Sequence, residues 1–105
     1  MRTLEFNVDK QRLKKNTDCD FSGIVAGSVG YLKAKFHFSE EWNDCKKAAS
    51  FWLEDQEYAM LLDSQDSCVI PEAALKESEF KVSVIGIRDG YKISSNKTKV
   101  RQEVY

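Results

Sequence analysis

Apolar and polar side chains alternate with a period of two along most of the chain. Residues 4–8 place Leu, Phe and Val on one face, and residues 31–38 place Leu, Ala and two Phe opposite two Lys and the only His. The same alternation returns at residues 48–53, 80–87 and 97–104. Half-buried antiparallel strands produce this pattern, so each of these segments is predicted to be a strand.

Two segments carry apolar residues on both faces. Residues 58–62 read Tyr-Ala-Met-Leu-Leu, which predicts a central strand covered on both sides. In residues 80–87, Ile85 and Ile87 interrupt the polar face and predict that this face also becomes buried near the end of the strand.

The breaks between these segments contain turn-forming residues. Asp89-Gly90 predicts a hairpin turn, because Gly tolerates a positive φ. Residues 54–57 and 63–66 are polar connections of hairpin length. The segment 23–30 contains three glycines but no nucleotide-binding spacing, so we expect a hairpin or bulge there.

Two short helical turns are predicted. Ser39 is expected to cap a turn at residues 40–42, where an acidic pair suits a helix N-terminus. Pro71 is expected at the first helical position before residues 72–76. About seven short strands with two helical turns predict an all-β, antiparallel sandwich or barrel.

Composition is that of one soluble globular domain spanning residues 1–105. The chain is 42% hydrophobic and 31% charged, with a net charge of −1. No apolar stretch approaches the ~20 residues needed to cross a bilayer, so no membrane association is expected. The N-terminus alternates instead of forming an apolar run, so we do not expect secretion by a signal peptide.

Charge is unevenly distributed. Residues 40–66 contain eight acidic and two basic residues, whereas residues 1–39 and 88–105 each carry an excess of three basic residues. A nearly neutral total argues against nonspecific nucleic-acid binding. The acidic segment is open to three interpretations, namely solvated turns, a partner-facing patch or a mimic of nucleic acid.

Candidate chemical sites are few. Asp18 and Asp20 begin a calcium-loop spacing, but the twelfth position is Val29 where a Glu is needed, so we expect Asx-type turns instead. Cys19, Cys45, Cys68 and His37 have the composition of a zinc site, but no two cysteines have the close spacing that preorganises one.

We therefore predict no metal, no cofactor and free thiols, with Cys68 packed as a small hydrophobic residue. His37 lies in the outward register of its strand with no acid nearby in the sequence to orient it. We expect the protein not to be an enzyme.

Binding through aromatic and cationic side chains is the remaining expectation. Of Trp42 and Trp52, we expect one to fill the core and the other to lie exposed beside Tyr58 in an interaction patch. On the last strand, the cations are expected either to block edge pairing or to contact a partner; they are Lys97, Lys99 and Arg101.

The order of motifs from residue 31 resembles a known family. Its landmarks are Phe36-His37-Phe38 before Ser39-Glu40-Glu41-Trp42, the strand 47–51, Leu61-Leu62-Asp63, Cys68-Val69-Ile70-Pro71 and Val82-Ser83-Val84-Ile85-Gly86. This order, over residues 31–88, is similar to that of small β-sandwich modules in head-fibre and upper-baseplate proteins of phages and prophages of Gram-positive bacteria. The resemblance implies an immunoglobulin-like, non-enzymatic domain that attaches to a virion or self-assembles.

The leading hypothesis is therefore a virion-associated structural or attachment module. Its partners would be capsid, tail or baseplate proteins, and homo-oligomers are a further expectation. It would assemble in the host cytoplasm and then reside in the virion. The family's modules usually continue into a fibre or receptor-binding region, and this chain ends at Tyr105. The alternative hypothesis is a phage-encoded inhibitor of a host nuclease or defence complex that presents the acidic segment as a nucleic-acid mimic.

Overall fold

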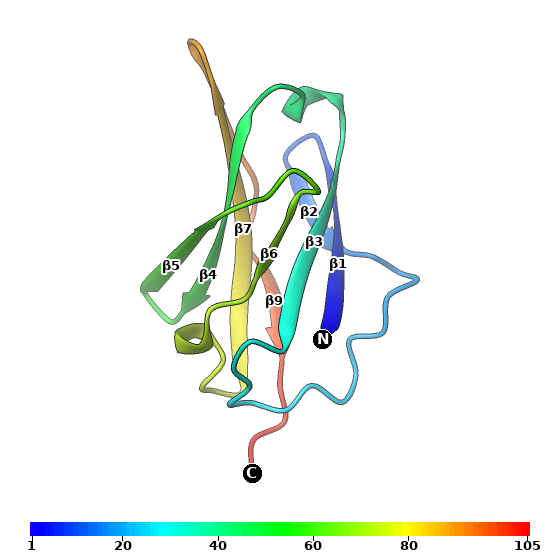
Figure 1. The fold of residues 1–105 in the computed structure, drawn as a ribbon, viewed down its shortest axis with the longest axis vertical. Helices are drawn as coiled ribbons and strands as arrows, with labels where there is room; N and C mark the ends of the chain where they lie inside the picture. The colour runs from blue at the N-terminus through cyan, green and yellow to red at the C-terminus, as the bar shows by residue number, and fades with distance from the viewer.

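The computed structural model describes residues 1–105 as an all-β sandwich of nine strands (Figure 1). The strands are β1 (Arg2–Asp9), β2 (Arg12–Lys15), β3 (Leu32–Phe38), β4 (Lys46–Leu53), β5 (Gln56–Leu61), β6 (Ser67–Val69), β7 (Glu79–Arg88), β8 (Tyr91–Ser94) and β9 (Thr98–Arg101). Two 3₁₀ turns, η1 (Glu40–Trp42) and η2 (Glu72–Ala74), connect strands of opposite sheets. No helix in the structure has the length and apolar character required to span a membrane.

The strands form two sheets with a Greek-key connection. One sheet has the order β2-β1-β3-β6; the other has the order β5-β4-β7-β8, with β9 also pairing with β7. The chain crosses from β3 to β4 and β5, returns to β6 beside β3, and crosses again to β7 beside β4. This alternation between sheets is found in immunoglobulin-like sandwiches, so the predicted fold class is confirmed.

One pair of strands departs from the antiparallel expectation. β1 and β3 run parallel, with Phe6 beside Phe36 and Asn7 beside His37. Parallel neighbours need a long connection, which here includes β2 and the loop of residues 16–31. The glycine-containing segment 23–30 lies in this loop and is neither a hairpin nor a strand bulge, and the loop buries Ile24 against the core.

The prediction of a central strand at residues 58–62 is wrong. Residues 58–61 belong to β5, which is an edge strand, and Leu61 is 78% exposed. The expectation for the second face of β7 is also wrong at its end, because Ile87 is 52% exposed and Ile85 is only half-buried. Apolar composition alone does not report whether another layer covers a sheet face.

Three predicted turns occur where expected. Asp89-Gly90 joins β7 to β8, and Gly90 has a φ of +68°. β4 and β5 are joined by Glu54 and Asp55 alone, because Gln56 and Glu57, predicted as part of this connection, already belong to β5. In the connection to β6, the Asp63 carboxylate accepts hydrogen bonds from the backbone N–H groups of Gln65 and Ser67, which lower its pKa.

The two helical turns occur where they were predicted, but their first residues are not stabilised in the predicted way. Ser39 precedes η1, yet its hydroxyl donates to the Glu41 carboxylate instead of capping the backbone. Pro71 precedes η2 instead of occupying its first position, and the turn ends at Ala74. Asp20 forms the predicted Asx turn, because its Oδ1 accepts the backbone N–H of Ser22 at 2.8 Å.

A single core of 20 buried residues fills the space between the sheets. A row of stacked aromatic rings follows the inner face of the first sheet, where Phe6 and Phe36 lie 5.3 Å apart and Phe36 and Phe38 lie 5.9 Å apart. Phe51 and Phe80 pack together from the other sheet. Because both inner faces are occupied by the core, any partner of the sandwich must use its edges, loops or outer faces.

Candidate functional site

Trp42 is the tryptophan that fills the core. It is fully buried, its ring centroid lies 4.9 Å from that of Phe38 in a tilted arrangement, and its indole N–H donates to the Lys10 carbonyl at 2.7 Å. Gly86 leaves room for it, since a Cβ at that position would lie 2.8 Å from the indole. Trp42 is therefore the one of the two candidate tryptophans that the sandwich encloses, and as a candidate contact residue only Trp52 is left.

Trp52 lies on the outer face of the five-stranded sheet. Its indole N–H donates to the Ser83 hydroxyl at 3.0 Å, and the Lys97 ammonium lies 3.7 Å from the ring centroid. These two contacts hold a half-buried aromatic ring beneath a cation. Tyr58 is aligned with Phe51 and packs toward the core, so Trp52 and Tyr58 lie on opposite faces and do not form the predicted joint patch.

A β-bulge brings Lys97 to Trp52. Ile85 is paired with Ser94 and Val82 with Thr98, so the two intervening residues of β7 face three residues of the other strand, 95–97. Lys99 and Arg101 follow on β9, opposite Lys81 and Glu79 on the same outer face. The structure thus places Trp52 and all three predicted cations on one face.

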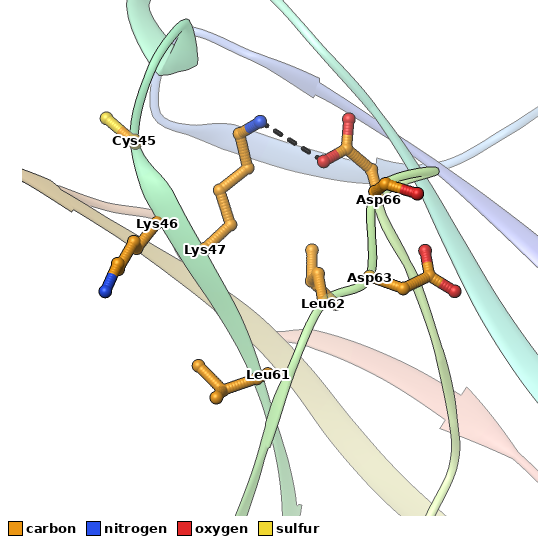
Figure 2. Close-up of a pocket in the computed structure, with 8 residues that line it drawn as sticks. Cys45, Lys46, Lys47, Leu61, Leu62, Asp63 and Asp66 are labelled. Atoms are coloured by element: carbon orange, nitrogen blue, oxygen red, sulfur yellow. Dashed lines mark hydrogen bonds and ion pairs between the residues drawn. The ribbon is translucent and has the colours of Figure 1, made fainter.

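Apolar side chains extend this face toward the edge of the sheet. Leu61, Ala48 and Ile85 form one row across β5, β4 and β7, and the exposed Ile87 lies beside Lys46. In Figure 2, Leu61 and Lys46 extend away from Lys47, which belongs to the other side of β4. The sequence pattern did not identify these residues as contact residues, because apolar side chains on the second face of a strand equally predict a second buried face.

Positive charge shares this face with the apolar row. Six cations project from this face: Lys46, Lys81, Lys92, Lys97, Lys99 and Arg101. The strands contribute only two acids there, and both have partners on the face. Glu57 accepts a hydrogen bond from Ser50, and Glu79 lies 3.5 Å from the Lys99 ammonium. We call this surface, from Leu61 to Arg101, the cationic face.

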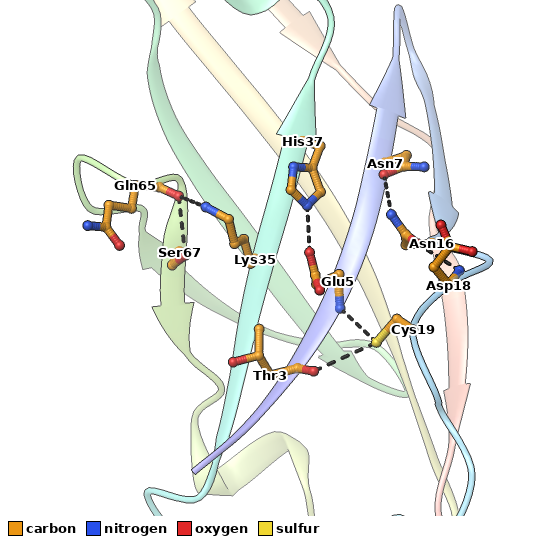
Figure 3. A network of polar contacts seen from close by, with 10 residues as sticks. All are labelled: Thr3, Glu5, Asn7, Asn16, Asp18, Cys19, Lys35, His37, Gln65 and Ser67. Atoms are coloured by element: carbon orange, nitrogen blue, oxygen red, sulfur yellow. Dashed lines mark hydrogen bonds and ion pairs between the residues drawn. The ribbon is translucent and has the colours of Figure 1, made fainter.

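The outer face of the other sheet is polar and internally paired (Figure 3). Glu5 and His37 lie 2.7 Å apart, and the Lys35 ammonium donates to the Gln65 carbonyl at 2.7 Å. The Asn16 amide donates to Asn7 at 3.1 Å. Side chains that already bond one another must give up those bonds to bind a partner, so this face is the less suited to docking.

The structure gives His37 an acidic partner that sequence proximity did not reveal. Glu5 reaches it because β1 runs beside β3, although 32 residues separate the two in the chain. Both side chains remain exposed, at 47% for His37 and 41% for Glu5. The pair lies on an open sheet surface without a cleft that would shield a reacting group from water.

The three cysteines do not gather around His37. The Cys19 sulfur accepts the Glu5 backbone N–H beside β1, as Figure 3 shows. Cys45 lies near Gly86, where a Cβ at the glycine would be 3.2 Å from the Cys45 Cβ. Cys68 is buried in β6, where desolvation and then the Asp63 carboxylate raise the pKa of its thiol to about 12. No group of three metal-ligating side chains occurs in the structure.

A shallow cleft lies between the start of β4 and the β5–β6 connection (Figure 2). Lys47 spans it, with its ammonium 3.1 Å from Asp66 and 5.1 Å from the Phe38 ring centroid. The half-buried ion pair ties the connection to β4. Its two charges satisfy each other, so Lys47 and Asp66 act in this cleft as a structural contact.

Neither the protein-family models nor the curated proteins compared with the chain match it.

Proposed function

We propose that the protein is a non-enzymatic, virion-associated attachment or structural module of a phage or prophage, and that it docks through the cationic face. The observation that carries this proposal is an outer sheet face on which Leu61 and Ile87 are exposed, Ile85 is half-buried and six cations project. Apolar side chains surrounded by charge are typical of protein-interaction surfaces. The virion assignment is supported by the motif order of residues 31–88.

The charge of the face indicates the chemistry of its partner. A partner surface that is apolar at its centre and acidic at its margin would bury Leu61 and Ile87 and pair with the lysines. We therefore expect the partner to be a capsid, tail or baseplate protein with such a surface. Trp52 supplies an aromatic anchor whose ring is already fixed by Ser83 and Lys97. A fixed ring loses little conformational entropy on binding.

The inhibitor hypothesis receives less support from the fold. The acidic segment 40–66 is divided between both ends of β4, with Glu40 and Asp44 before the strand and Glu54 and Asp55 after it. An eight-residue strand separates these clusters, so their charges do not follow one another at the spacing of adjacent phosphates.

Particle association tests the proposal. The tagged chain is produced in host cells while the encoding phage assembles, and particles are purified on a density gradient and assayed for the chain. We expect wild-type protein in the particles, and a reduction of about tenfold or more for Leu61→Asp and Ile87→Asp, because each places a carboxylate within the apolar contact.

Val69→Asp is the matched control, since Val69 is 39% exposed on the outer face of the opposite sheet. It should associate as well as wild type. Absence of the wild-type chain from particles would contradict the virion assignment. Undiminished association of both cationic-face variants would contradict the assignment of the docking surface.

A further inference from the structure

β5 has an unpaired backbone edge. The Leu62 N–H donates to the Lys47 carbonyl, which identifies that pair as a hydrogen-bonded one in the β4–β5 ladder. Because such pairs alternate along antiparallel strands, Tyr58 and Met60 also bond to β4. The N–H and C=O groups of Glu57, Ala59 and Leu61 therefore point away from the sheet.

The other sheet edges are protected from pairing. β2 is joined to the opposite sheet, where the Asn96 side chain bonds both the N–H and the C=O of Leu13. β6 has only three residues, and the β8–β9 edge carries lysines and an arginine. In contrast, residues 58–62 contain no charged residue and no proline, the features that commonly prevent edge pairing.

We propose that β5 pairs antiparallel with β5 of a second copy of this chain, about a two-fold axis at Ala59. In this register Ala59 faces Ala59, and Glu57 faces Leu61 on each side of the axis. All three outward-pointing residues of each strand then lie in hydrogen-bonded pairs. Tyr58 and Met60, both half-buried in one copy, face each other across the new ladder and cover their remaining exposed surface.

Neighbouring registers are less favourable. If the partner strand is shifted so that Glu57 faces a residue two positions nearer the C-terminus than Leu61, Glu57 lies opposite Asp63 and like charges come together. A shift of two residues toward the N-terminus places Leu61 opposite Asp55, which lies in the β4–β5 turn and cannot extend the ladder. The charge pattern and the turn thus select the register centred on Ala59.

The pairing joins the two cationic faces. A two-fold axis that relates antiparallel neighbours in this way is perpendicular to the sheet, so both outer faces point in the same direction. The dimer presents one continuous platform with two copies of the docking surface, which increases avidity for a repetitive partner such as a symmetric particle. The dimer itself does not rest on the proposed function, and its test requires no partner.

Mass measurement in solution tests this inference. Light scattering or sedimentation over a dilution series should give twice the chain mass of 12.1 kDa for wild type at high concentration. Ala59→Pro should remain monomeric, because proline removes only an outward-pointing N–H at an edge position. Ile87→Lys, on the same face but two strands from the edge, should dimerise as wild type does.

Charge exchange separates loss of pairing from loss of folding. Ala59→Lys and Ala59→Glu should each be monomeric, because each places like charges opposite one another at the axis, and an equal mixture should form a heterodimer. A wild-type chain that is monomeric at every concentration would overturn the inference. Dimers of Ala59→Lys alone, or folded variants whose mixture stays monomeric, would also overturn it.

Discussion

Individual residues in this sandwich are fixed by close contacts that tolerate little change. Gly86 is required because the Trp42 indole occupies the space of a side chain at that position. The indole cannot move away easily, since it is fully buried and bonded to the Lys10 carbonyl. Trp42 and Gly86 therefore form a matched pair at the corner between β3 and β4.

We expect Gly86→Ala to lower the free energy of unfolding by about 1–3 kcal/mol, the usual cost of overpacking. Denaturant unfolding measures the effect. Combining the change with Trp42→Phe, which removes the overlapping ring, should reduce the additional cost of the alanine. An equal cost in both backgrounds would show that the indole contact is not responsible.

Cys68 illustrates how burial controls reactivity. Its thiol pKa is raised to about 12 from an ordinary value of 9.0, whereas Cys19 and Cys45 are partly exposed. At about pH 8, iodoacetamide should modify Cys19 and Cys45 in the native protein and Cys68 only after denaturation, because the thiolate is the reactive form. Peptide mass spectrometry measures the order, and early labelling of Cys68 would contradict it.

The same thiol makes stability depend on pH. Between about pH 9 and 12 the unfolded chain loses the Cys68 proton while the folded chain keeps it, so the free energy of unfolding should fall as pH rises. Below pH 9 both states are protonated and this contribution is fully present. Cys68→Ala should lessen the fall, which unfolding curves at several pH values measure; an unchanged slope would contradict this assignment.

At the scale of elements, side chains join the two sheets along one side. The bulge at residues 95–97 turns Asn96 toward β2, where its amide oxygen accepts the Leu13 N–H at 2.7 Å. Thr98 also donates to the Leu13 carbonyl, at 2.7 Å. The bulge therefore joins the two sheets through Asn96 and also brings Lys97 over Trp52 on the outer face.

Asn96→Ala should lower the free energy of unfolding by about 1–3 kcal/mol, because it leaves the Leu13 N–H without a partner in a buried position. Asn7→Ala is the matched control, since that side chain bonds only Asn16 on an exposed face. It should change stability by less than about 0.5 kcal/mol. Equal effects in chemical denaturation would show that the bulge does not join the sheets.

Element positions were predictable where alternation was long and turns had glycine. β2 was not predicted, because Leu13 is its only apolar residue and the turn before it uses Lys10 at a φ of 56° without a glycine. β5 was found but placed at the centre of a sheet. Its apolar side chains are the same at an edge as at a centre, so only its neighbours distinguish the two.

At the scale of the whole molecule, the two sheets share one core. Phe36 lies on β3 and Phe51 on β4, and each is at most 1% exposed. We expect Phe36→Ala and Phe51→Ala each to cost about 3–5 kcal/mol, with one cooperative transition retained. Circular dichroism and tryptophan fluorescence should give coincident curves; separate transitions, or a cost below about 1 kcal/mol, would contradict a shared core.

The candidate site emerged only at this scale. Trp52, Lys97, Lys99 and Arg101 were predicted as contact residues, and the sheet register places them on one face. Leu61 and Ile87 were not predicted, although they are the exposed apolar part of that face. One of Trp42 and Trp52 was expected in the core, and local sequence did not distinguish which, because it does not report what covers a side chain.

The alternation of side chains by itself determined that this chain forms strands and which side chains share a face, because successive side chains of a strand point to opposite sides. The tertiary structure decided which faces are covered, which strands are edges, and that Glu5 meets His37 across a parallel pair. These outcomes depend on contacts between segments far apart in the chain. Local pattern does not encode them, because an apolar face is equally suited to a second sheet, a partner or another copy.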